Sequence, residues 1–493
     1  MKLGELLRLA GLPGANDAGG DQTVTGFAID HRKVAPGTIF GAFQGASVNG
    51  EDFIPAAIRA GAIAVVARPQ ARVEGALHLT DVNPRRAFAR LAAGFFSPYP
   101  ATIAAVTGTN GKTSTVEMTR QIWRMAGERA ASIGTLGVTT PDGSVSTGLT
   151  TPDIVTFLAN MAGLAREGVS HVAYEASSHG LDQYRGEGPT VSASAFTNFS
   201  RDHLDYHGTM EAYFAAKMRL FTEVAAPGSP AVIHDAGDGS EWTAKAIAAA
   251  AARGLRVLTV GEGGDFLRLI AREPGQLGQL LQIEHEGEVR KVNLPLIGAY
   301  QAANALVAAG LALATGVAAS ATFDALTRLQ PVRGRLERAA LNAAGAPAYV
   351  DYAHTPDALE AAIAALRPHV APGGRLIVVF GAGGDRDVGK RPQMGEVAAR
   401  AADLAIVTDD NPRSEDPAAI RAAILAGAGK STREIGDRRA AIAAAIGEAG
   451  PADIVLIAGK GHEQGQIFGS GDTMRIEAFD DVEVARECAG GQC

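Results

Sequence analysis

Cysteine is almost absent from this chain. Only two of its 493 residues are cysteines, Cys488 and Cys493, and both lie in a glycine-rich segment at the C-terminus. So few thiols exclude a disulfide framework of the kind that stabilises small secreted domains. We therefore expect a cytoplasmic protein in a reducing environment.

The chain also lacks a basic surplus and long apolar runs. Its 45 Lys and Arg against 53 Asp and Glu give a formal net charge of −8, which argues against a general nucleic-acid or membrane binder. No apolar run approaches the roughly 20 residues needed to span a bilayer. The N-terminus, Met1 to Leu7, carries Glu5 within its apolar stretch and predicts a short helix, not a signal peptide. We expect neither nucleic-acid binding nor membrane insertion.

The length of the chain predicts about three domains, at a usual size of ~150 residues each. The two prolines of Ser97–Pro100 predict a linker, and a second boundary is expected at Pro331. Short apolar strands alternate with helical stretches, which predicts an α/β fold with parallel sheets. We expect a small α/β domain (1–98), a central P-loop-type ATPase domain (99–331) and a C-terminal Rossmann-like doubly wound domain (332–493).

A phosphate loop is the clearest motif. Thr102–Val106 predicts a buried strand, and Gly108-Thr-Asn-Gly111-Lys112-Thr113 then opens a helical pattern that runs to Met125. Glycines let backbone N–H groups approach phosphates, the lysine reaches the terminal phosphates, and the threonine can face Mg²⁺. The spacing, Gly-x-x-Gly-Lys-Thr, is shorter than the common one. We nevertheless expect triphosphate binding here.

Other polar groups follow neighbouring strands of this segment. Glu175 ends one predicted strand and fits either a Mg²⁺ ligand or a surface acid, while Asn198–Gly208 fits either a site or a solvated loop. Lys217 lies in an apolar helical stretch, where a lone lysine is more often a snorkelling surface residue. Ligands of parallel sheets bind at the carboxyl ends of strands, so we expect the phosphate loop, Glu175 and Asn198 to meet at one edge.

Four polar loops also follow four predicted strands in the third segment. They are Asp351–Pro356, Asp385–Pro392, Asp409–Arg413 and Gly459–Glu463. Any one of them could be a surface turn, but together they predict a substrate site on one face. Their arginines suit carboxylate recognition, because a guanidinium grips both oxygens.

Taken together, these motifs resemble the Mur ligase family, the ATP-dependent ligases that build the peptidoglycan stem peptide. The resemblance covers nearly the whole chain and rests on residues 108–114, 175–181, 198–208, 298–304, 334–335 and 351–356 and on the C-terminal loops. It implies that ATP phosphorylates the D-Glu carboxylate of UDP-N-acetylmuramoyl-L-alanyl-D-glutamate. An amine then attacks the acyl phosphate, giving an amide, ADP and phosphate. We expect these small molecules to be the only partners of a monomer.

The resemblance also implies roles for individual residues. The family's catalytic positions fall on Lys112, Glu175, His203 and Lys217. The ATP positions fall on Gly108, Thr109, Asn110, Gly111, Lys112, Thr113, Ser114, Asn304, Arg335, Asp351 and His354. The metal positions fall on Thr113, Glu175, His203 and Lys217, the last as a CO₂-derived carbamate (N6-carboxylysine) that supports Mg²⁺. The UDP-substrate positions fall on Asp30, His31, Arg32, Gln44, Thr150, Thr151, Ser177, Gln183 and Arg185. His31 departs from the family, which commonly has Ser there.

The added amino acid depends on Arg413. In the family this arginine marks enzymes for meso-diaminopimelate, whose distal end bears a carboxylate that lysine lacks. The matching positions are Arg386, Asp410, Asn411, Pro412, Arg413, Gly459 and Glu463. We expect a diaminopimelate ligase. The alternatives are an L-lysine ligase of the same family, a folylpolyglutamate synthase, which would lack the domain of residues 1–98, and a nucleotide-dependent switch or binding protein.

Overall fold

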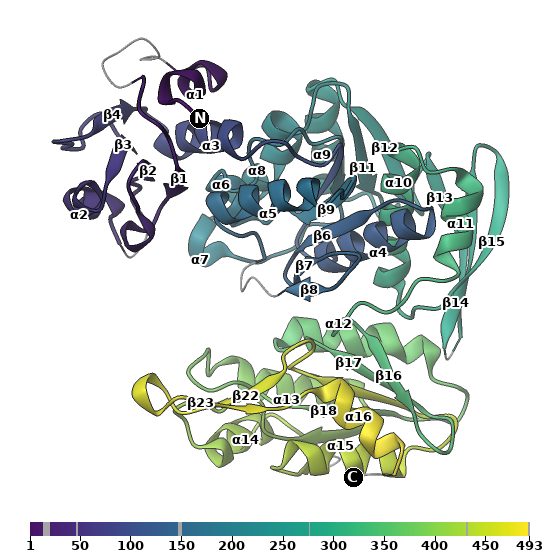
Figure 1. The fold of residues 1–493 in the computed structure, drawn as a ribbon. Coiled ribbons are helices and arrows are strands. Elements are labelled where there is room, and N and C mark those ends of the chain that lie inside the picture. Colours follow the sequence, from purple (N-terminus) through teal and green to yellow (C-terminus); the bar gives the residue numbers. More distant parts are fainter. Residues whose placement is uncertain (13–19, 46–47, 146–149, 276, 430–431, 492–493) are drawn as a thin grey trace. The chain divides into compact units, whose positions relative to one another are not determined.

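The structure is a computed structural model that describes residues 1–12, 20–45, 48–145, 150–275, 277–429 and 432–491 (Figure 1). It contains two compact units. The first comprises Met1–Asp265 and Val307–Ala319, and the second comprises Phe266–Leu306 and Ser320–Cys493. The N-terminal, central and C-terminal parts are all α/β, as predicted.

The N-terminal part has a four-stranded parallel sheet in the order β1-β2-β3-β4. Its strands are β1 (Gly26–Ala28), β2 (Thr38–Gly41), β3 (Ala62–Ala67) and β4 (Leu77–Thr80), and its helices are α1 (Leu3–Leu9), α2 (Ile54–Arg59) and α3 (Pro84–Phe96). The short N-terminal helix is confirmed. Helix α3 was not predicted, although Asn83 caps it by accepting from Arg86 N and Pro84 suits its first turn.

The rest of the first unit is built on a sheet whose strands run in the order β12-β11-β10-β5-β9-β6-β7-β8. The strands are β5 (Thr102–Thr107), β6 (Ala130–Gly134), β7 (Gly137–Thr139), β8 (Ser144–Val145), β9 (His171–Glu175), β10 (Ala193–Phe196), β11 (Pro230–His234) and β12 (Arg256–Gly261). The helices are α4 (Lys112–Met125), α5 (Ile154–Arg166), α6 (Ser178–Asp182), α7 (Leu204–His207), α8 (Met210–Arg219) and α9 (Glu241–Ala252). All neighbours from β12 to β6 are parallel, while β7 and β8 are antiparallel.

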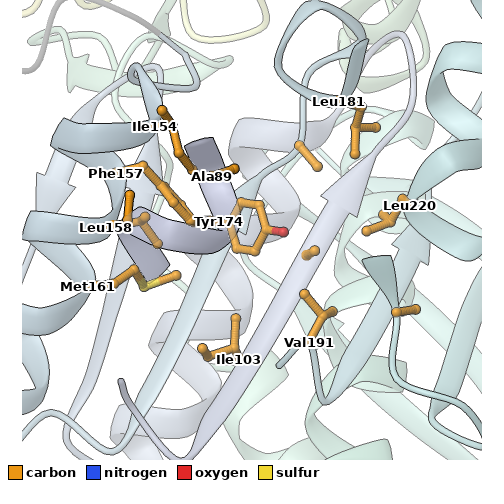
Figure 2. Close-up of a cluster of buried hydrophobic side chains, with 14 of the residues drawn as sticks. Ala89, Ile103, Ile154, Phe157, Leu158, Met161, Tyr174, Leu181, Val191 and Leu220 are labelled. Atoms are coloured by element: carbon orange, nitrogen blue, oxygen red, sulfur yellow. The ribbon is translucent and has the colours of Figure 1, made fainter. Parts of the chain in front are cut away.

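A continuous apolar core supports the strands that carry the site. Figure 2 shows Phe157, Leu158 and Met161 of α5 beside Tyr174 of β9, with Ala89 of α3 on the same side. The rings of Phe157 and Tyr174 meet edge to face at 5.1 Å. Burying a side chain of this size contributes roughly 1.5–3 kcal/mol. Helices α3 and α5 thus fix β9 and its neighbour β5 from one face.

The second unit contains a doubly wound sheet in the order β16-β17-β21-β18-β19-β20, parallel except for β16. Its strands are β16 (Glu337–Leu341), β17 (Pro347–Asp351), β18 (Leu376–Phe380), β19 (Leu404–Val407), β20 (Thr432–Glu434) and β21 (Ile454–Ala458). The helices of this unit are α11 (Ala319–Leu326, from Ser320 onward), α12 (Pro356–Leu366), α13 (Lys390–Ala401), α14 (Pro417–Leu425), α15 (Arg438–Glu448) and α16 (Asp481–Ala489). Helix α10 (Ala299–Ala314) begins in this unit and belongs to the first unit from Val307 onward. The Rossmann-like prediction is confirmed.

Two antiparallel features of this unit were not predicted. One is the meander β13 (Leu267–Gly275), β14 (Gly278–His285) and β15 (Glu288–Leu294), and the other is the hairpin β22 (Gly465–Phe468) and β23 (Arg475–Ala478). Buried and half-buried residues alternate strictly in β14, which is the period-2 pattern of a strand with two unlike faces.

No helix within the described ranges is long and apolar enough to cross a membrane. Cys488, in α16, is disulfide-bonded. One such bond near the end of the chain is no disulfide framework. Cys493 lies outside the described residues.

Candidate active site

The phosphate loop depends on two glycines with positive φ. Gly108 has φ 142°, and a Cβ there would lie 2.0 Å from Thr197 Oγ1. Gly111 has φ 84° and forms the N-cap of α4. Residues that carry a side chain rarely adopt such φ values, so the backbone of this loop requires glycine at both positions. It presents the N-terminus of a 14-residue helix, where the first N–H groups lack intrahelical acceptors and favour anions.

The end of β10 holds the loop in place. Asn198 accepts from Thr109 N through its carbonyl (2.9 Å) and from Asn110 N through Oδ1 (2.9 Å), while its Nδ2 donates to Asn110 O (3.1 Å). Thr197 Oγ1 also donates to Asn110 O, at 2.6 Å. The predicted meeting of Asn198 with the phosphate loop is therefore observed. Asn198 shapes the loop, a role that the sequence did not reveal.

Two lysines converge on one carbonyl of this loop. Lys217 Nζ donates to Gly108 O at 2.7 Å, and Lys112 Nζ donates to the same oxygen at 3.0 Å and to Thr109 O at 2.8 Å. Lys217 is only 1% exposed and its ammonium lies 4.4 Å from the centre of the Tyr213 ring. The snorkelling interpretation of Lys217 is therefore wrong.

Burial changes the chemistry of Lys217. It lowers the pKa of the Lys217 amine well below its ordinary value, the charge of Lys112 lowers it further, and Asp202 opposes both. A desolvated lysine near another cation favours the neutral amine. A neutral amine has a lone pair and is a nucleophile.

The candidate metal ligands differ in exposure. Glu175 is 2% exposed, so it is no surface acid, and its carboxylate accepts from Thr135 N (2.7 Å) and from Thr135 Oγ1 (3.3 Å). Thr113 is buried in the first turn of α4. The His203 side chain is 46% exposed and lies 3.4 Å from Asp202. Across the described ranges, no three His, Cys, Asp or Glu side chains gather as metal ligands.

Five expected UDP-substrate residues lie at this same edge. Thr151 Oγ1 donates to Glu175 O (2.8 Å) and lies 2.9 Å from Ser177 Oγ, and Thr150 Oγ1 lies 3.0 Å from Thr135 Oγ1. The remaining contacts join Arg185 to Thr151 O (3.1 Å) and to Gln183 Oε1 (2.7 Å). Burial lowers the pKa of the Arg185 guanidinium. The group forms one polar surface beside Glu175.

The other four lie on loops after β1 and β2 of the N-terminal part. Arg32 pairs with Asp30 at 2.7 Å, which lowers the pKa of Asp30 to about 2. The His31 ring stacks on Phe53 at 4.4 Å, which gives this departure from the family a packing role. Gln44 accepts through its carbonyl from Arg85, at 3.0 Å. Ala46 and Ser47, which follow Gln44 in the same loop, lie outside the described residues.

The expected ATP residues beyond the phosphate loop lie in the second unit. Asn304 Nδ2 donates to Gln301 Oε1 (3.3 Å), and Gln301 Nε2 donates to Arg335 O (2.8 Å). Asp351 accepts from Leu336 N (2.8 Å) and Ala353 N (2.9 Å), and burial raises its pKa. His354 Nδ1 lies 2.8 Å from Tyr352 O in the loop after β17.

The four polar loops of the second unit meet at one edge, because β17, β21, β18 and β19 are parallel neighbours. Arg413 Nη1 donates to Gly384 O (2.8 Å), in the loop that carries the exposed Arg386. Asn411 Nδ2 donates to Glu463 Oε2, also at 2.8 Å. This sheet edge therefore brings together loops that carry the residues expected to bind the added amino acid. Pro412 is buried, and Asp410 packs beside Gly459, where a Cβ would lie 2.4 Å from Asp410 Oδ2.

Some residues that build the sites were missed. Thr135 contacts Glu175 through a hydrogen bond between segments 40 residues apart, which no local pattern signals. Lys460 and Arg438 are buried cations of the second unit. They lie at or next to its four polar loops (351–356, 385–392, 409–413 and 459–463), which we call the amino-acid loops. Lys460 stands within a loop already singled out, so its charge was the available signal.

Comparison with protein families matches three stretches of the chain. Residues 23–96 match the Mur ligase family, catalytic domain; residues 106–312 match the Mur ligase middle domain; and residues 334–461 match the Mur ligase, glutamate ligase domain.

Relatives and a solved structure agree with this. The UDP-N-acetylmuramoyl-L-alanyl-D-glutamate–2,6-diaminopimelate ligase of Zymomonas mobilis subsp. mobilis is 60% identical over 467 residues, covering 95% of each chain. That of Bradyrhizobium diazoefficiens is 55% identical over 465 residues, covering 94% of each. A solved structure of a ligase of the same name has a TM-score of 0.75 and 32% identity, covering 100% of this chain and 99% of the other. The chain belongs to the Mur ligase family.

Proposed function

We propose that this chain is an ATP-dependent ligase that joins meso-2,6-diaminopimelate to the D-Glu of UDP-N-acetylmuramoyl-L-alanyl-D-glutamate, a step of peptidoglycan precursor synthesis. One observation carries the proposal: relatives 60% and 55% identical over nearly the whole chain are named as ligases for these substrates. Two separate sheet edges support it, because the sheet of the first unit carries a phosphate loop and the sheet of the second unit carries four polar loops.

In the first step, a carboxylate oxygen of D-Glu bonds to the γ-phosphorus of ATP as the bond from that phosphorus to ADP breaks. The N-terminus of α4 and Lys112 hold the phosphates and offset the charge that moves. The polar surface of Thr151, Ser177 and Arg185 orients the dipeptide. Its bonds to Glu175 O and Gln183 support this placement.

Mg²⁺ would be held by Glu175, His203, Thr113 and a carbamate on Lys217, and when bound it would neutralise phosphate charge. The donor set fits a hard cation, because all but one of these groups offer oxygen. Lys217 fits the modification, since its depressed pKa and burial favour the neutral amine. The neutral nitrogen adds to the carbon of CO₂ and loses a proton, which leaves a carbamate anion on the Lys217 side chain.

In the second step, an amine of diaminopimelate attacks the acyl carbon, the bond from that carbon to the phosphate oxygen breaks, and the nitrogen loses a proton to solvent as the amide forms. Arg413 and Arg386 receive the distal carboxylate, which favours diaminopimelate over lysine. The positive φ of Arg413, 53°, supports a positioned side chain, because non-glycine residues hold this conformation only when their surroundings fix it. The L-lysine ligase lacks a use for Arg413. A nucleotide switch would not need the four polar loops that meet at one sheet edge of the second unit.

A product assay tests the proposal. The chain is incubated with ATP, Mg²⁺ and the UDP-muramoyl-dipeptide, and a panel of amino acids is added one at a time. We expect amide product and ADP in equal amounts with meso-diaminopimelate and little product with L-lysine. Faster turnover with lysine would favour the L-lysine ligase. ATP hydrolysis at the same rate with and without the UDP-muramoyl-dipeptide and the amino acid would favour the nucleotide-dependent switch.

Three finer predictions accompany the proposal. The division into domains at residues 98 and 331 is supported by the three matched stretches, and limited proteolysis tests it. A monomer is expected, which sedimentation tests. The cytoplasmic location expected from the scarcity of cysteine is tested by cell fractionation.

A further inference from the structure

A lysine is buried behind the amino-acid loops of the second unit. Lys460 follows β21 and Gly459, and its side chain is 0% exposed. Its Nζ donates to Asn411 Oδ1 at 3.0 Å and lies 3.4 Å from Glu463 Oε2. A buried charge is costly unless it is paired and hydrogen-bonded. Asn411 and Glu463 supply these partners to Lys460, which ties the two residues together.

The amide of Asn411 is almost fully used by this arrangement. Its Oδ1 accepts from Lys460 Nζ and from Ile467 N, both at 3.0 Å, which uses both acceptor sites. Its Nδ2 donates to Glu463 Oε2 at 2.8 Å. One N–H of the amide remains outside these bonds. Asn411 can therefore offer an amino acid one donor and no acceptor, which suits a carboxylate.

The carboxylate of Glu463 has the opposite character. An ionised carboxylate accepts about four hydrogen bonds, and Asn411 and Lys460 reach one of its two oxygens. Its side chain is 33% exposed, so a ligand can approach it. The remaining acceptor positions suit an ammonium group. Asn411 and Glu463 thus offer one donor and one anion, side by side, to a zwitterionic end.

Strand β22 completes the support from the other side. Gln466 Nε2 donates to Asp410 O at 2.6 Å, and Arg413 N donates to Ile467 O at 3.0 Å. Hydrogen bonds with β22 thus hold the backbone of residues 410–413 at both ends. Lys460 bonds to both Asn411 and Glu463 from within this support.

We propose that Lys460 is a positioning residue for the added amino acid, acting through Asn411 and Glu463, which receive the zwitterionic distal end. The proposal deepens the proposed function and rests on it. Lys460 does not touch the amino acid in this account. Its ammonium orients the Asn411 amide and fixes the direction of the Glu463 carboxylate.

Lys460→Met tests this in the full chain, because it keeps the length of the side chain and removes the charge. We expect the KM for meso-diaminopimelate to rise roughly ten- to hundredfold, the loss typical of a hydrogen bond to a charged group. The KM values for ATP and the UDP-muramoyl-dipeptide should stay within about twofold, as should kcat at saturation. Lys291→Met, at an exposed lysine of β15, is the matched control and should change none of these values. An unchanged KM for diaminopimelate in Lys460→Met would overturn the proposal.

A second pair of variants keeps the test valid if Lys460→Met folds poorly. Lys460→Met combined with Glu463→Gln leaves no unpaired buried charge, so it is expected to fold. Against Glu463→Gln alone, the added Lys460→Met should raise the KM for diaminopimelate by less than about threefold, because one of its two targets is already altered. A tenfold or larger added effect, equal to that in the wild-type background, would contradict action through Glu463.

The unaltered chain separates the two levels of the account. If it forms no product with meso-diaminopimelate, the proposed function fails and takes the inference with it. If it forms product at wild-type KM and Lys460→Met does the same, only the inference about Lys460 fails.

Discussion

In the first unit, polar side chains converge on main-chain atoms of one short loop, whereas in the second unit a buried side-chain cation joins two of the four polar loops. Lys112 and Lys217 both donate to Gly108 O. In the second unit, Lys460 links Asn411 to Glu463. The first arrangement follows from a contiguous motif. The second depends on packing between segments that are far apart in the chain.

Arg438 shows how far the second arrangement extends. Its guanidinium donates to Asp409 O (3.3 Å), in the loop after β19, and to Ala458 O (3.0 Å), the last residue of β21. It also pairs with the fully buried Asp481 at 2.6 Å. The charge of Asp481 offsets the burial of the guanidinium. A phosphate site can thus be encoded by glycine placement, while selection of an amino acid needs a supporting network.

The largest expected effect is that of Lys217→Ala in the first unit. Removing the amine removes the group proposed to carry the carbamate, and the variant should lose about 10³-fold in kcat, in the range seen when one charge-stabilising group is lost. Short carboxylates added to the assay should restore part of the activity. Lys245→Ala, at a half-exposed lysine of α9, is the control and should be unaffected. Full activity of Lys217→Ala without rescue would rule out the carbamate.

Gly108→Ala should have the next largest effect, roughly a hundredfold loss of kcat/KM for ATP. The new Cβ would meet Thr197 Oγ1 at 2.0 Å and would require a φ of 142°, so the loop must move. Gly127→Ala is the matched control, because Gly127 also has positive φ, 97°, but no atom lies within 4 Å of its Cβ position. Equal losses in both variants would show that backbone strain, and not crowding of the loop, limits activity.

Arg413→Ala in the second unit should act on one substrate alone. We expect the KM for meso-diaminopimelate to rise roughly ten- to fiftyfold through loss of a charge-assisted hydrogen bond, with the KM for ATP unchanged. Arg475→Ala, at an exposed arginine of β23, is the control. Steady-state kinetics with each substrate varied in turn measures this. A parallel rise in both KM values would remove the distinction between the two sites.

Much of this could be predicted where the pattern was local. The bounds of β5 and α4 agree within one residue with the strand and the helical pattern predicted around the phosphate loop. Contacts across the chain could not be predicted, because nothing near Lys460 indicates Asn411, 49 residues away, and nothing near Arg438 indicates Asp481, 43 residues away. The burial of Lys217 was hidden for the same reason. Its acceptor, Gly108 O, lies 109 residues earlier.

The smallest expected effect concerns pH and the stability of the second unit. Burial and the charges of Arg335 and Arg333 lower the pKa of His462 to about 4, from an ordinary 6.5. The unfolded chain therefore binds a proton that the folded chain does not, and stability falls as the pH drops from about 6.5 toward 4. His462→Gln should remove about 1 kcal/mol of that loss, reduced because the ring is partly solvated. Chemical unfolding at pH 7 and pH 5 measures it, and an identical pH slope in both proteins would contradict the burial of a neutral ring.

The most direct test separates activation of the UDP-substrate from choice of the amino acid. Acyl phosphate is measured by borohydride trapping with ATP, Mg²⁺ and the UDP-muramoyl-dipeptide, in the absence of any amino acid. We predict that Arg413→Ala forms it at the rate of the unaltered chain, and that Lys217→Ala forms it about 10³-fold more slowly. If both variants lose the trapped product equally, the two sites do not have the separate roles assigned to them.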